Sequence, residues 1–244
     1  MNLRYRRLKG TRDILLEEVE KLRWCEERWC QVLSRYGYGE IRTPVIEPTD
    51  LFLRSVGKGT DIVDKEMYTF ESKSGESLTL RPEMTASVVR AYLENGLTRQ
   101  PGTVKFYYIA PMFRHDRPQA GRYRQFHQVG VEALGSDSPV LDAEVIQTAM
   151  ALFDAVDVKG VMVHVNSIGC PECRPAFLED LKVFLKDNIE VVPESMRGRI
   201  DTNPLRLYDA KDDGVNQLLA GFKPITESLC KGCQDHHDIV LRTL

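Results

Sequence analysis

A long hairpin pattern between Thr103 and Gly135 constrains the fold of this chain most. Its first run is rich in Val, Phe, Tyr and Ile, and its second run alternates large and polar residues with period two, as the side chains of a strand do. The polar loop between the runs, from His115 to Tyr123, is too charged to be buried and too long for a tight turn. The pattern therefore predicts a long antiparallel hairpin whose loop projects from the edge of a sheet.

One face of the second strand has an unusual mixture of side chains. Alternate residues of a strand share a face, so an unbroken strand would place on one side Arg124, Phe126, Gln128, Gly130 and Glu132. The glycine would leave room for a ligand to lie on the backbone. Arg114, at the end of the first strand, adds a forked cation that suits phosphate or carboxylate oxygens. We interpret this face as a binding surface; a solvated outer face with one stray aromatic ring is the alternative.

Composition sets limits on what the chain binds. Its 244 residues, 42% hydrophobic and 28% charged, suffice for one or two globular domains. A net charge of -3 excludes a wholly basic surface for nucleic acid, so any RNA contact must come from a local basic cluster such as the one in the hairpin loop. No stretch resembles a signal peptide or approaches membrane-spanning length. We therefore expect a cytoplasmic protein with no membrane partner.

Periodicity outside the hairpin predicts further elements. Helices are expected over 14–36 with Asp13 as a cap, after the loop LRPEMT up to Asn95 and Gly96, and over 142–156, 174–187, 216–219 and from 225 onward. Strands are expected over 40–46, 67–70, 78–80 and 161–166. His164 lies in the last of these strands and is interpreted as a structural histidine.

Three stretches resemble those of a known family. FRHDRPQAGRYRQFHQVGVE closely resembles the second signature motif of class II aminoacyl-tRNA synthetases, in the form found in histidyl-tRNA synthetases. GYGEIRTPVIEP, after the first helix, resembles the first motif, and LRPEMT resembles a substrate-binding loop of the histidyl enzymes. The resemblance spans nearly the whole chain. It implies an α/β fold of the α+β type, with a mixed, mainly antiparallel sheet flanked by helices and a mostly helical insertion.

The resemblance also implies partners and a reaction. Histidine would attack the α-phosphate of ATP, and the resulting histidyl-adenylate would pass its acyl group to tRNA(His). Mg²⁺ would accompany ATP, held mainly by phosphate oxygens and water. The first-motif region would join two copies into a homodimer, whereas a plain edge strand is the alternative for that region, because proline is confined to sheet edges.

Site residues follow from the matched positions. Arg114 would be catalytic, because it would neutralise charge that develops on the α-phosphate. Three residues would bind ATP: Arg114, Arg122 and Phe126. Four would bind histidine: Glu83, Thr85, Gln128 and Glu132. Two would meet the tRNA acceptor end: Arg117 and Gln119. From the residues alone, Glu83 at a helix start could equally serve only to complement the helix dipole.

Cysteine pairs mark a second region. Helical patterns replace the alternating ones from Ile168 onward, so we place a boundary near Gly169, with an aminoacylation core over 1–168 and an insertion over 169–244. The insertion carries two CxxC pairs, formed by Cys170, Cys173, Cys230 and Cys233. Four thiolates could hold one structural Zn²⁺ if the fold brings the pairs together. Reduced thiols without metal are the alternative in a cytosolic chain.

Several parts of a complete synthetase are not found before Leu244: the third class II motif, the histidine-specific segment and the anticodon-binding domain. We therefore expect a truncated histidine-tRNA ligase that activates histidine poorly or not at all. Two other functions are weighed. One is the synthetase-like regulatory subunit of ATP phosphoribosyltransferase, and the other is a zinc-bound interaction module centred on the insertion. The loop HDRPQAGRYRQFHQ favours the ligase, because a regulatory subunit has little reason to keep residues that face tRNA.

Overall fold

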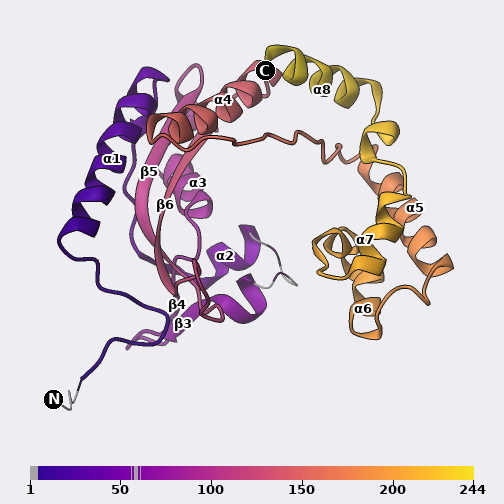
Figure 1. The fold of residues 1–244 in the computed structure, drawn as a ribbon. Helices are drawn as coiled ribbons and strands as arrows, with labels where there is room; N and C mark the ends of the chain where they lie inside the picture. The colour runs from indigo at the N-terminus through magenta and orange to yellow at the C-terminus, as the bar shows by residue number, and fades with distance from the viewer. Residues whose placement is uncertain (1–4, 56, 58–59, 61) are drawn as a thin grey trace. The chain divides into compact units, whose positions relative to one another are not determined.

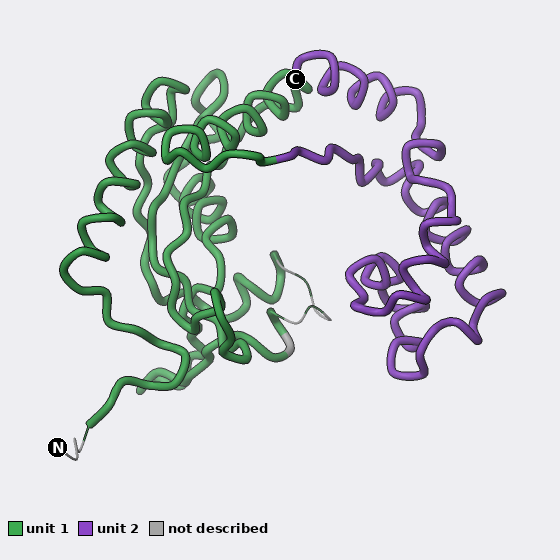
Figure 2. The backbone as a smooth tube through the Cα atoms, in the orientation of Figure 1, with its two compact units in different colours: residues 1–161 green, residues 162–244 purple. Residues whose placement is uncertain are grey.

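The chain forms two compact units, residues 1–161 and residues 162–244 (Figure 2). The structure, a computed structural model, describes residues 5–244 except 56, 58, 59 and 61. The sequence pattern placed a boundary near Gly169, whereas the two units divide between Val161 and Met162. The extended segment that leads to Cys170 therefore belongs to the second unit.

A long hairpin forms the centre of the first unit (Figure 1). Strands β5 (Val104–Phe113) and β6 (Gln125–Leu134) pair antiparallel along their whole length. The short strand β1 (Gly39–Glu40) lies parallel beside β5, which gives the order β1-β5-β6. The predicted hairpin is confirmed, and so is the mixed, mainly antiparallel sheet.

Helices cover both faces of this hairpin (Figure 1). On one face, α1 (Glu17–Arg35) and α4 (Pro139–Ala155) pack on Tyr107, Val129 and Val131. On the other face, Met84 and Val88, at the start of α3 (Thr85–Glu94), form a core with three residues of β5: Tyr108, Ala110 and Met112. Phe126 packs against this second core. The alternation of side chains expected from the sequence is therefore present in the fold.

A second, smaller sheet supports α3. Its order is β2-β4-β3, with β2 (Ile46–Pro48) and β3 (Tyr68–Glu71) both antiparallel to β4 (Ser77–Leu80). The predicted hairpin of β3 and β4 is confirmed. The single strand expected over 40–46 is wrong, because the chain passes from β1 in one sheet to β2 in the other with Pro44 between them. Shorter elements complete the unit: α2 (Thr49–Ser55), the π-helix η1 (Ile62–Glu66) and the 3-10 helix η2 (Leu97–Arg99).

The ends of the first helix correct one detail. Helix α1 begins at Glu17, after Leu16 with a positive φ, so Asp13 does not cap it. Its end before Gly37 and the end of α3 at Asn95 and Gly96 agree with the sequence pattern.

The second unit is helical in the part of the chain that the structure describes. Four helices form it, α5 (Arg174–Asp187), α6 (Glu194–Thr202), α7 (Asp213–Ala220) and α8 (Lys231–Thr243), with the 3-10 helices η3 (Pro204–Asp209) and η4 (Ile225–Ser228) between them. Its core is aliphatic and aromatic, with Leu181, Leu185, Val192, Val215 and Leu207 fully buried. No described helix of either unit is long and apolar enough to cross a membrane.

The strand predicted over Val161–Asn166 is wrong. This segment has no strand assignment and no strand partner among the described residues, and Met162 is 76% exposed. His164 is exposed as well, so it is not the core or sheet histidine that the alternation suggested. An alternating pattern indicates a strand only where a second strand completes its hydrogen bonds.

Candidate functional site

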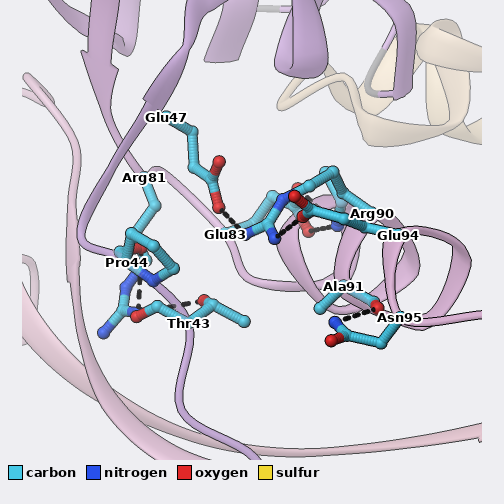
Figure 3. A network of polar contacts seen from close by, with 10 residues as sticks. Thr43, Pro44, Glu47, Arg81, Glu83, Arg90, Ala91, Glu94 and Asn95 are labelled. Carbon is cyan, nitrogen blue, oxygen red and sulfur yellow. Dashed lines mark hydrogen bonds and ion pairs between the residues drawn. The ribbon is translucent and has the colours of Figure 1, made fainter.

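Arg81, a buried residue that the sequence reasoning did not single out, fixes the loop between β4 and α3. Its side chain is 3% exposed, and its Nε donates to the carbonyl oxygen of Pro111 at 3.0 Å. Its Nη1 donates to the carbonyl oxygen of Thr43 at 3.0 Å (Figure 3). Burial lowers the pKa of this guanidinium. Arg81 therefore ties the loop to β5 and to the chain between the two sheets.

Glu83 lies in this loop and caps α3. Its carboxylate accepts the backbone N–H of Ala86, and the nitrogen of Ala86 lies 3.1 Å from Oε1 and 3.4 Å from Oε2 (Figure 3). A carboxylate here satisfies a free N–H of the first helical turn and complements the helix dipole. One turn further along α3, Arg90 pairs with the buried Glu47 at 2.5 Å, which anchors the helix to β2. The structural role considered for Glu83 is thus present, and it holds the carboxylate at the start of α3.

Thr85 and Glu132 meet across the space between α3 and the hairpin. The hydroxyl of Thr85 donates to Oε1 of Glu132 at 2.6 Å. Burial raises the pKa of Glu132, and the nearby charge of Glu83 adds to the rise, whereas the bond from Thr85 lowers it. Glu132 forms no ion pair with any residue that the structure describes. Its half-buried carboxylate can accept a donor from a ligand.

Tyr108 is a second residue that the sequence reasoning missed. It pairs across the hairpin with Gly130, and a Cβ at Gly130 would overlap Cζ of the tyrosine ring. The room that this glycine leaves is therefore filled by the ring of Tyr108, not left open for a ligand. Burial, with the charge of Glu132, raises the pKa of Tyr108 to about 12, so its hydroxyl stays protonated. A glycine opposite a tyrosine in the strand register is the sequence signal that could have found it.

Gln128 has a buried amide oxygen without a partner. Its Oε1 accepts no hydrogen bond from any described residue. An unsatisfied buried carbonyl costs about 1–3 kcal/mol, so such atoms in a folded protein usually have a water or a ligand as partner. Gln128 shares its strand face with Phe126 and Glu132. The face therefore offers an aromatic ring, an amide and a carboxylate in sequence order.

The three residues assigned to ATP line one hollow. Arg114, Arg122 and Phe126 border a space of about 380 Å³, together with Glu66, Asp116, Gly121 and Tyr123. The guanidinium carbon of Arg114 lies 5.3 Å from the centre of the Phe126 ring. Its Nε donates to the carbonyl oxygen of Pro82 at 2.8 Å, and within the described chain its two Nη atoms have no recorded hydrogen-bond partner. A fixed guanidinium with free donors beside an aromatic face suits a nucleotide phosphate and base.

The two residues assigned to tRNA lie in the loop of the hairpin. Arg117 and Gln119 are exposed and line neither this hollow nor the one beside α3. Arg122 binds Asp116 at 3.0 Å, which fixes its guanidinium at the edge of the nucleotide-sized hollow. Arg124 lies directly before β6, and its carbonyl oxygen accepts the backbone N–H of Arg114 at 3.0 Å. The aliphatic part of its side chain lies close to Gly10.

A second hollow, of about 570 Å³, lies beside α3. Glu83 and Thr85 line it, with a mostly apolar surround formed by Leu51, Arg54, Ser55, Ile62, Ala86, Val89, Arg90 and Leu93. Gln128 and Glu132 do not line this hollow. Of the four residues assigned to histidine, the structure joins Thr85 and Glu132 directly and places Glu83 within electrostatic reach of Glu132. Gln128 lies on the same face of β6 as Glu132, and Gly130 stands between them on that face.

The second unit brings the two CxxC pairs together. The Sγ atoms of Cys170, Cys173, Cys230 and Cys233 all lie within 4.8 Å of one another. Four sulfur atoms at this spacing can hold one metal ion. Whether the pairs meet could not be read from the sequence, and the fold answers that question.

Comparison with known proteins gives a consistent result. The histidyl-tRNA synthetase family profile matches residues 10–182. A histidine-tRNA ligase of Desulforamulus reducens is 49% identical over 234 residues, which is 96% of this chain and 56% of the relative. Another, from Desulfitobacterium hafniense, is 50% identical over 94% of this chain and 54% of the relative. The chain thus spans about half the length of the curated relatives it matches.

Solved structures agree at the level of the fold. Apo histidyl-tRNA synthetase of S. aureus superposes with a TM-score of 0.74 at 33% identity, over 98% of this chain and 54% of that one. An ATP phosphoribosyltransferase regulatory subunit/histidyl-tRNA synthetase from Bacillus halodurans superposes with a TM-score of 0.65 at 17% identity, over 100% of this chain and 66% of that one. The second likeness concerns the fold alone. On the family profile and the close relatives, this chain belongs to the histidyl-tRNA synthetase family.

Proposed function

We propose that this chain provides the histidine- and ATP-binding part of a histidine-tRNA ligase, which joins histidine to tRNA(His) with ATP. The observation that carries the proposal is the ligand-facing row on β6. Phe126 borders a hollow with two arginines, and among the described residues the Oε1 of Gln128 has no hydrogen-bond partner and Glu132 has no cationic partner. A nucleotide beside an amino acid would use all three groups.

ATP would lie in the hollow of Arg114 and Phe126. The Nη atoms of Arg114 would bind the α-phosphate by two parallel hydrogen bonds, and the bond from its Nε to Pro82 supports this orientation. Phe126 would stack on the adenine, and Arg122 would reach the other phosphates. Mg²⁺ would be held mainly by phosphate oxygens and water. Catalysis would come from holding carboxylate and phosphate in line and neutralising charge on the phosphorus oxygens.

Histidine would be recognised by the acids near Thr85. Glu132 would accept an N–H of the imidazole, while Glu83 and the Oε1 of Gln128 would accept from the α-ammonium group. The raised pKa of Glu132 supports this role, because a half-buried acid without a cation gains from a donor. An amino acid without a ring N–H would leave Glu132 unpaired, which costs several kcal/mol and gives selectivity.

The tRNA and a second copy of the chain complete the proposed partners. Arg117 and Gln119 would meet the acceptor end of the tRNA, and their exposure supports this contact. A homodimer would form through the first-motif region, where Trp24, Val45 and Ile46 are 41%, 37% and 45% exposed. Exposed apolar groups of this kind mark protein contacts when they lie together. The protein would act in the cytosol.

The test is calorimetric titration of the chain with histidine and with Mg²⁺-ATP, each alone and in the presence of the other. We expect Glu132→Ala to weaken histidine binding about 100-fold and to leave ATP binding unchanged, because only the imidazole loses its acceptor. Arg114→Ala should do the reverse. Glu76→Gln, an exposed change in the turn between β3 and β4, is the matched control and should change neither affinity.

Three results would count against the proposal: no histidine binding by the parent chain, equal histidine affinity in Glu132→Ala, or equal ATP affinity in Arg114→Ala. The same titrations separate the ligase from a regulatory subunit. A ligase site should also bind a non-hydrolysable histidyl-adenylate analogue more tightly than histidine, because one molecule then fills both parts of the site. A regulatory subunit that senses histidine should bind histidine without ATP and gain nothing from the adenylate.

A further inference from the structure

We propose that the second unit is a zinc-binding unit, in which Cys170, Cys173, Cys230 and Cys233 coordinate one Zn²⁺ as thiolates. The proposal goes beyond the aminoacylation chemistry and does not depend on it, because all four cysteines lie in the second unit and the proposed histidine and ATP site lies in the first.

The spacing of the sulfur atoms fits a tetrahedral metal site. Sγ of Cys170 lies 3.7 Å from those of Cys173 and Cys230, and the Sγ atoms of Cys173 and Cys233 are 3.9 Å apart. A zinc ion with bonds of about 2.3 Å to four sulfur atoms places neighbouring sulfur atoms about 3.8 Å apart. A disulfide would need about 2.05 Å. The cluster therefore has the dimensions of a metal site, and all four cysteines are free.

The backbone around the first pair is shaped for a metal-bound sulfur. The N–H of Cys170 donates to Sγ of Cys173 at 3.3 Å, and a hydrogen bond to sulfur stabilises the thiolate form. Gly169, with a φ of +66°, lies directly before the pair, and a Cβ there would come within 3.0 Å of the Cys173 sulfur. Only a residue without a side chain lets the backbone turn this close to the sulfur.

Both pairs stand at helix starts. Cys173 directly precedes α5, and Cys230 directly precedes α8. The N-terminal ends of helices carry partial positive charge and lower the cost of an anionic sulfur. Arg174, the first residue of α5, has a buried Nε with no hydrogen-bond partner among the described residues. This nearby cation adds to the charge balance of four thiolates and one divalent ion.

The metal would have a structural task. Helix α8 buries only Val240, and the buried core of the second unit takes no residue from α8. Cys170 and Cys230 are 60 positions apart, and a link that closes a long loop removes much of the freedom of the open chain. The metal would fix the start of α8 to the start of α5. Four protein ligands leave no open position, which identifies a structural zinc site and not a catalytic one.

The test measures metal content and metal spectrum of the whole chain. We expect one zinc per chain in protein purified under reducing conditions without added chelator. After zinc removal, Co²⁺ should bind in a 1:1 ratio and give the intense visible absorption of tetrahedral cobalt with thiolate-to-cobalt charge transfer. Zn²⁺ should then displace the cobalt and abolish both bands, because zinc binds such sites more tightly than cobalt does.

Variants locate the site. Cys170→Ser and Cys233→Ser should lose the zinc, whereas Cys25→Ser, on α1 of the first unit, should keep it. Cys233→His should restore a metal ligand, hold one Co²⁺ and show about three quarters of the parent charge-transfer intensity, because three thiolates remain of four. Hydrogen exchange should speed up in α8 on zinc removal and stay unchanged in β5 and β6.

Four outcomes would overturn the assignment. Two concern the metal of the parent protein: no zinc together with no binding of Co²⁺, or iron in place of zinc. The other two are a mass that shows two disulfides in protein purified under reducing conditions, and full zinc content in Cys170→Ser. The parent metal content and cobalt spectrum decide the question even if a serine variant fails to fold. Histidine and ATP titrations of the first unit are separate measurements, so neither proposal falls with the other.

Discussion

The two units assemble their chemistry in opposite ways. In the first unit, the candidate binding residues Phe126, Gln128 and Glu132 come from alternate positions of one strand, β6, and share one face. In the second unit, the two cysteine pairs come from positions 60 residues apart. Backbone alternation alone sets the first arrangement. Only the packing of the helical core sets the second, so the two sites should respond differently to damage of their cores.

The cores also differ in kind. The second unit has one continuous apolar cluster built around α5, α6, α7 and the η3 turn. The hairpin divides the core of the first unit into two clusters, one under α1 and α4 and one under α3. Beside the second cluster lies a buried arginine whose donors hold backbone carbonyls of other segments. Stability should therefore depend on apolar packing in one unit and on buried polar contacts in the other.

The largest expected effect is in the second unit. Leu207 is fully buried in its core, so Leu207→Ala should lower the free energy of unfolding of this unit by about 2–5 kcal/mol, through lost burial and a cavity. Hydrogen exchange with peptide resolution should show faster exchange in α5 to α7 and no change in β5 and β6. Leu241→Ala, at a 48% exposed position on α8, is the control. Equal loss of protection in the hairpin would break the comparison, because the two units would then unfold together.

The corresponding change in the first unit is Arg81→Met, which keeps most of the volume and removes the donors. The carbonyl oxygens of Pro111 and Thr43 would lose their partners in a buried place. We expect a loss of about 2–4 kcal/mol in that unit, because unsatisfied buried groups carry a full desolvation cost. Arg42→Met, at a side chain that is 86% exposed, is the control and should leave stability nearly unchanged. A fully stable Arg81→Met variant would show that the loop does not depend on this arginine.

The same contrast explains what the sequence could reveal about the fold. Hairpin β5–β6 and its two faces were predictable, because alternation is local and the strands are neighbours in the chain. The segment Val161–Asn166 alternates too, yet no strand pairs with it in the described part of the chain, since a strand needs a partner that its own residues do not specify. Pro44 divided the expected strand over 40–46. Helix α6 was not predicted, because it contains a glycine and buries only Ile200.

The site was predictable to a similar degree. Arg114, Arg122 and Phe126 come together as their motif suggested, because they lie on one hairpin. Arg81 and Tyr108 were missed, because their contacts depend on partners that the local pattern does not name. The cysteine pairs were visible as pairs, but their meeting depends on the folding of the chain between cysteines that lie 60 positions apart.

A moderate effect is expected at Gly130, where the hairpin register matters most. Gly130→Ala would place a Cβ against the ring of Tyr108, and overpacking of this kind costs about 1–3 kcal/mol. Histidine binding should weaken as well, because Tyr108 lies beside Glu132. In the double variant with Tyr108→Ala, the combined loss of stability should be smaller than the sum of the single losses, since the clash has gone. Strictly additive losses would mean that the ring does not occupy the space over the glycine.

The smallest expected effect is a gain of stability at the binding face. Burial raises the pKa of Glu132, so the folded protein holds this proton more tightly than the unfolded chain does. At a pH below its ordinary pKa the acid is protonated in both states and costs nothing. The penalty appears as the pH rises through the interval between the ordinary and the raised pKa, and it is fully present above that interval. Glu132→Gln, which keeps an acceptor for Thr85, should therefore leave the free energy of unfolding unchanged at about pH 4 and raise it at about pH 8.

The gain from Glu132→Gln should stay below about 1 kcal/mol, because solvent screens a half-buried charge. Denaturant unfolding of the first unit at both pH values measures this gain of stability. Glu76→Gln is the matched control, since it removes an exposed carboxylate of the same unit and should give no pH-dependent difference. A loss of stability at high pH would mean that the carboxylate is held by favourable contacts, and Glu132 would then be a structural acid. A gain of stability together with lost histidine binding is the trade-off expected of a charge kept for its ligand.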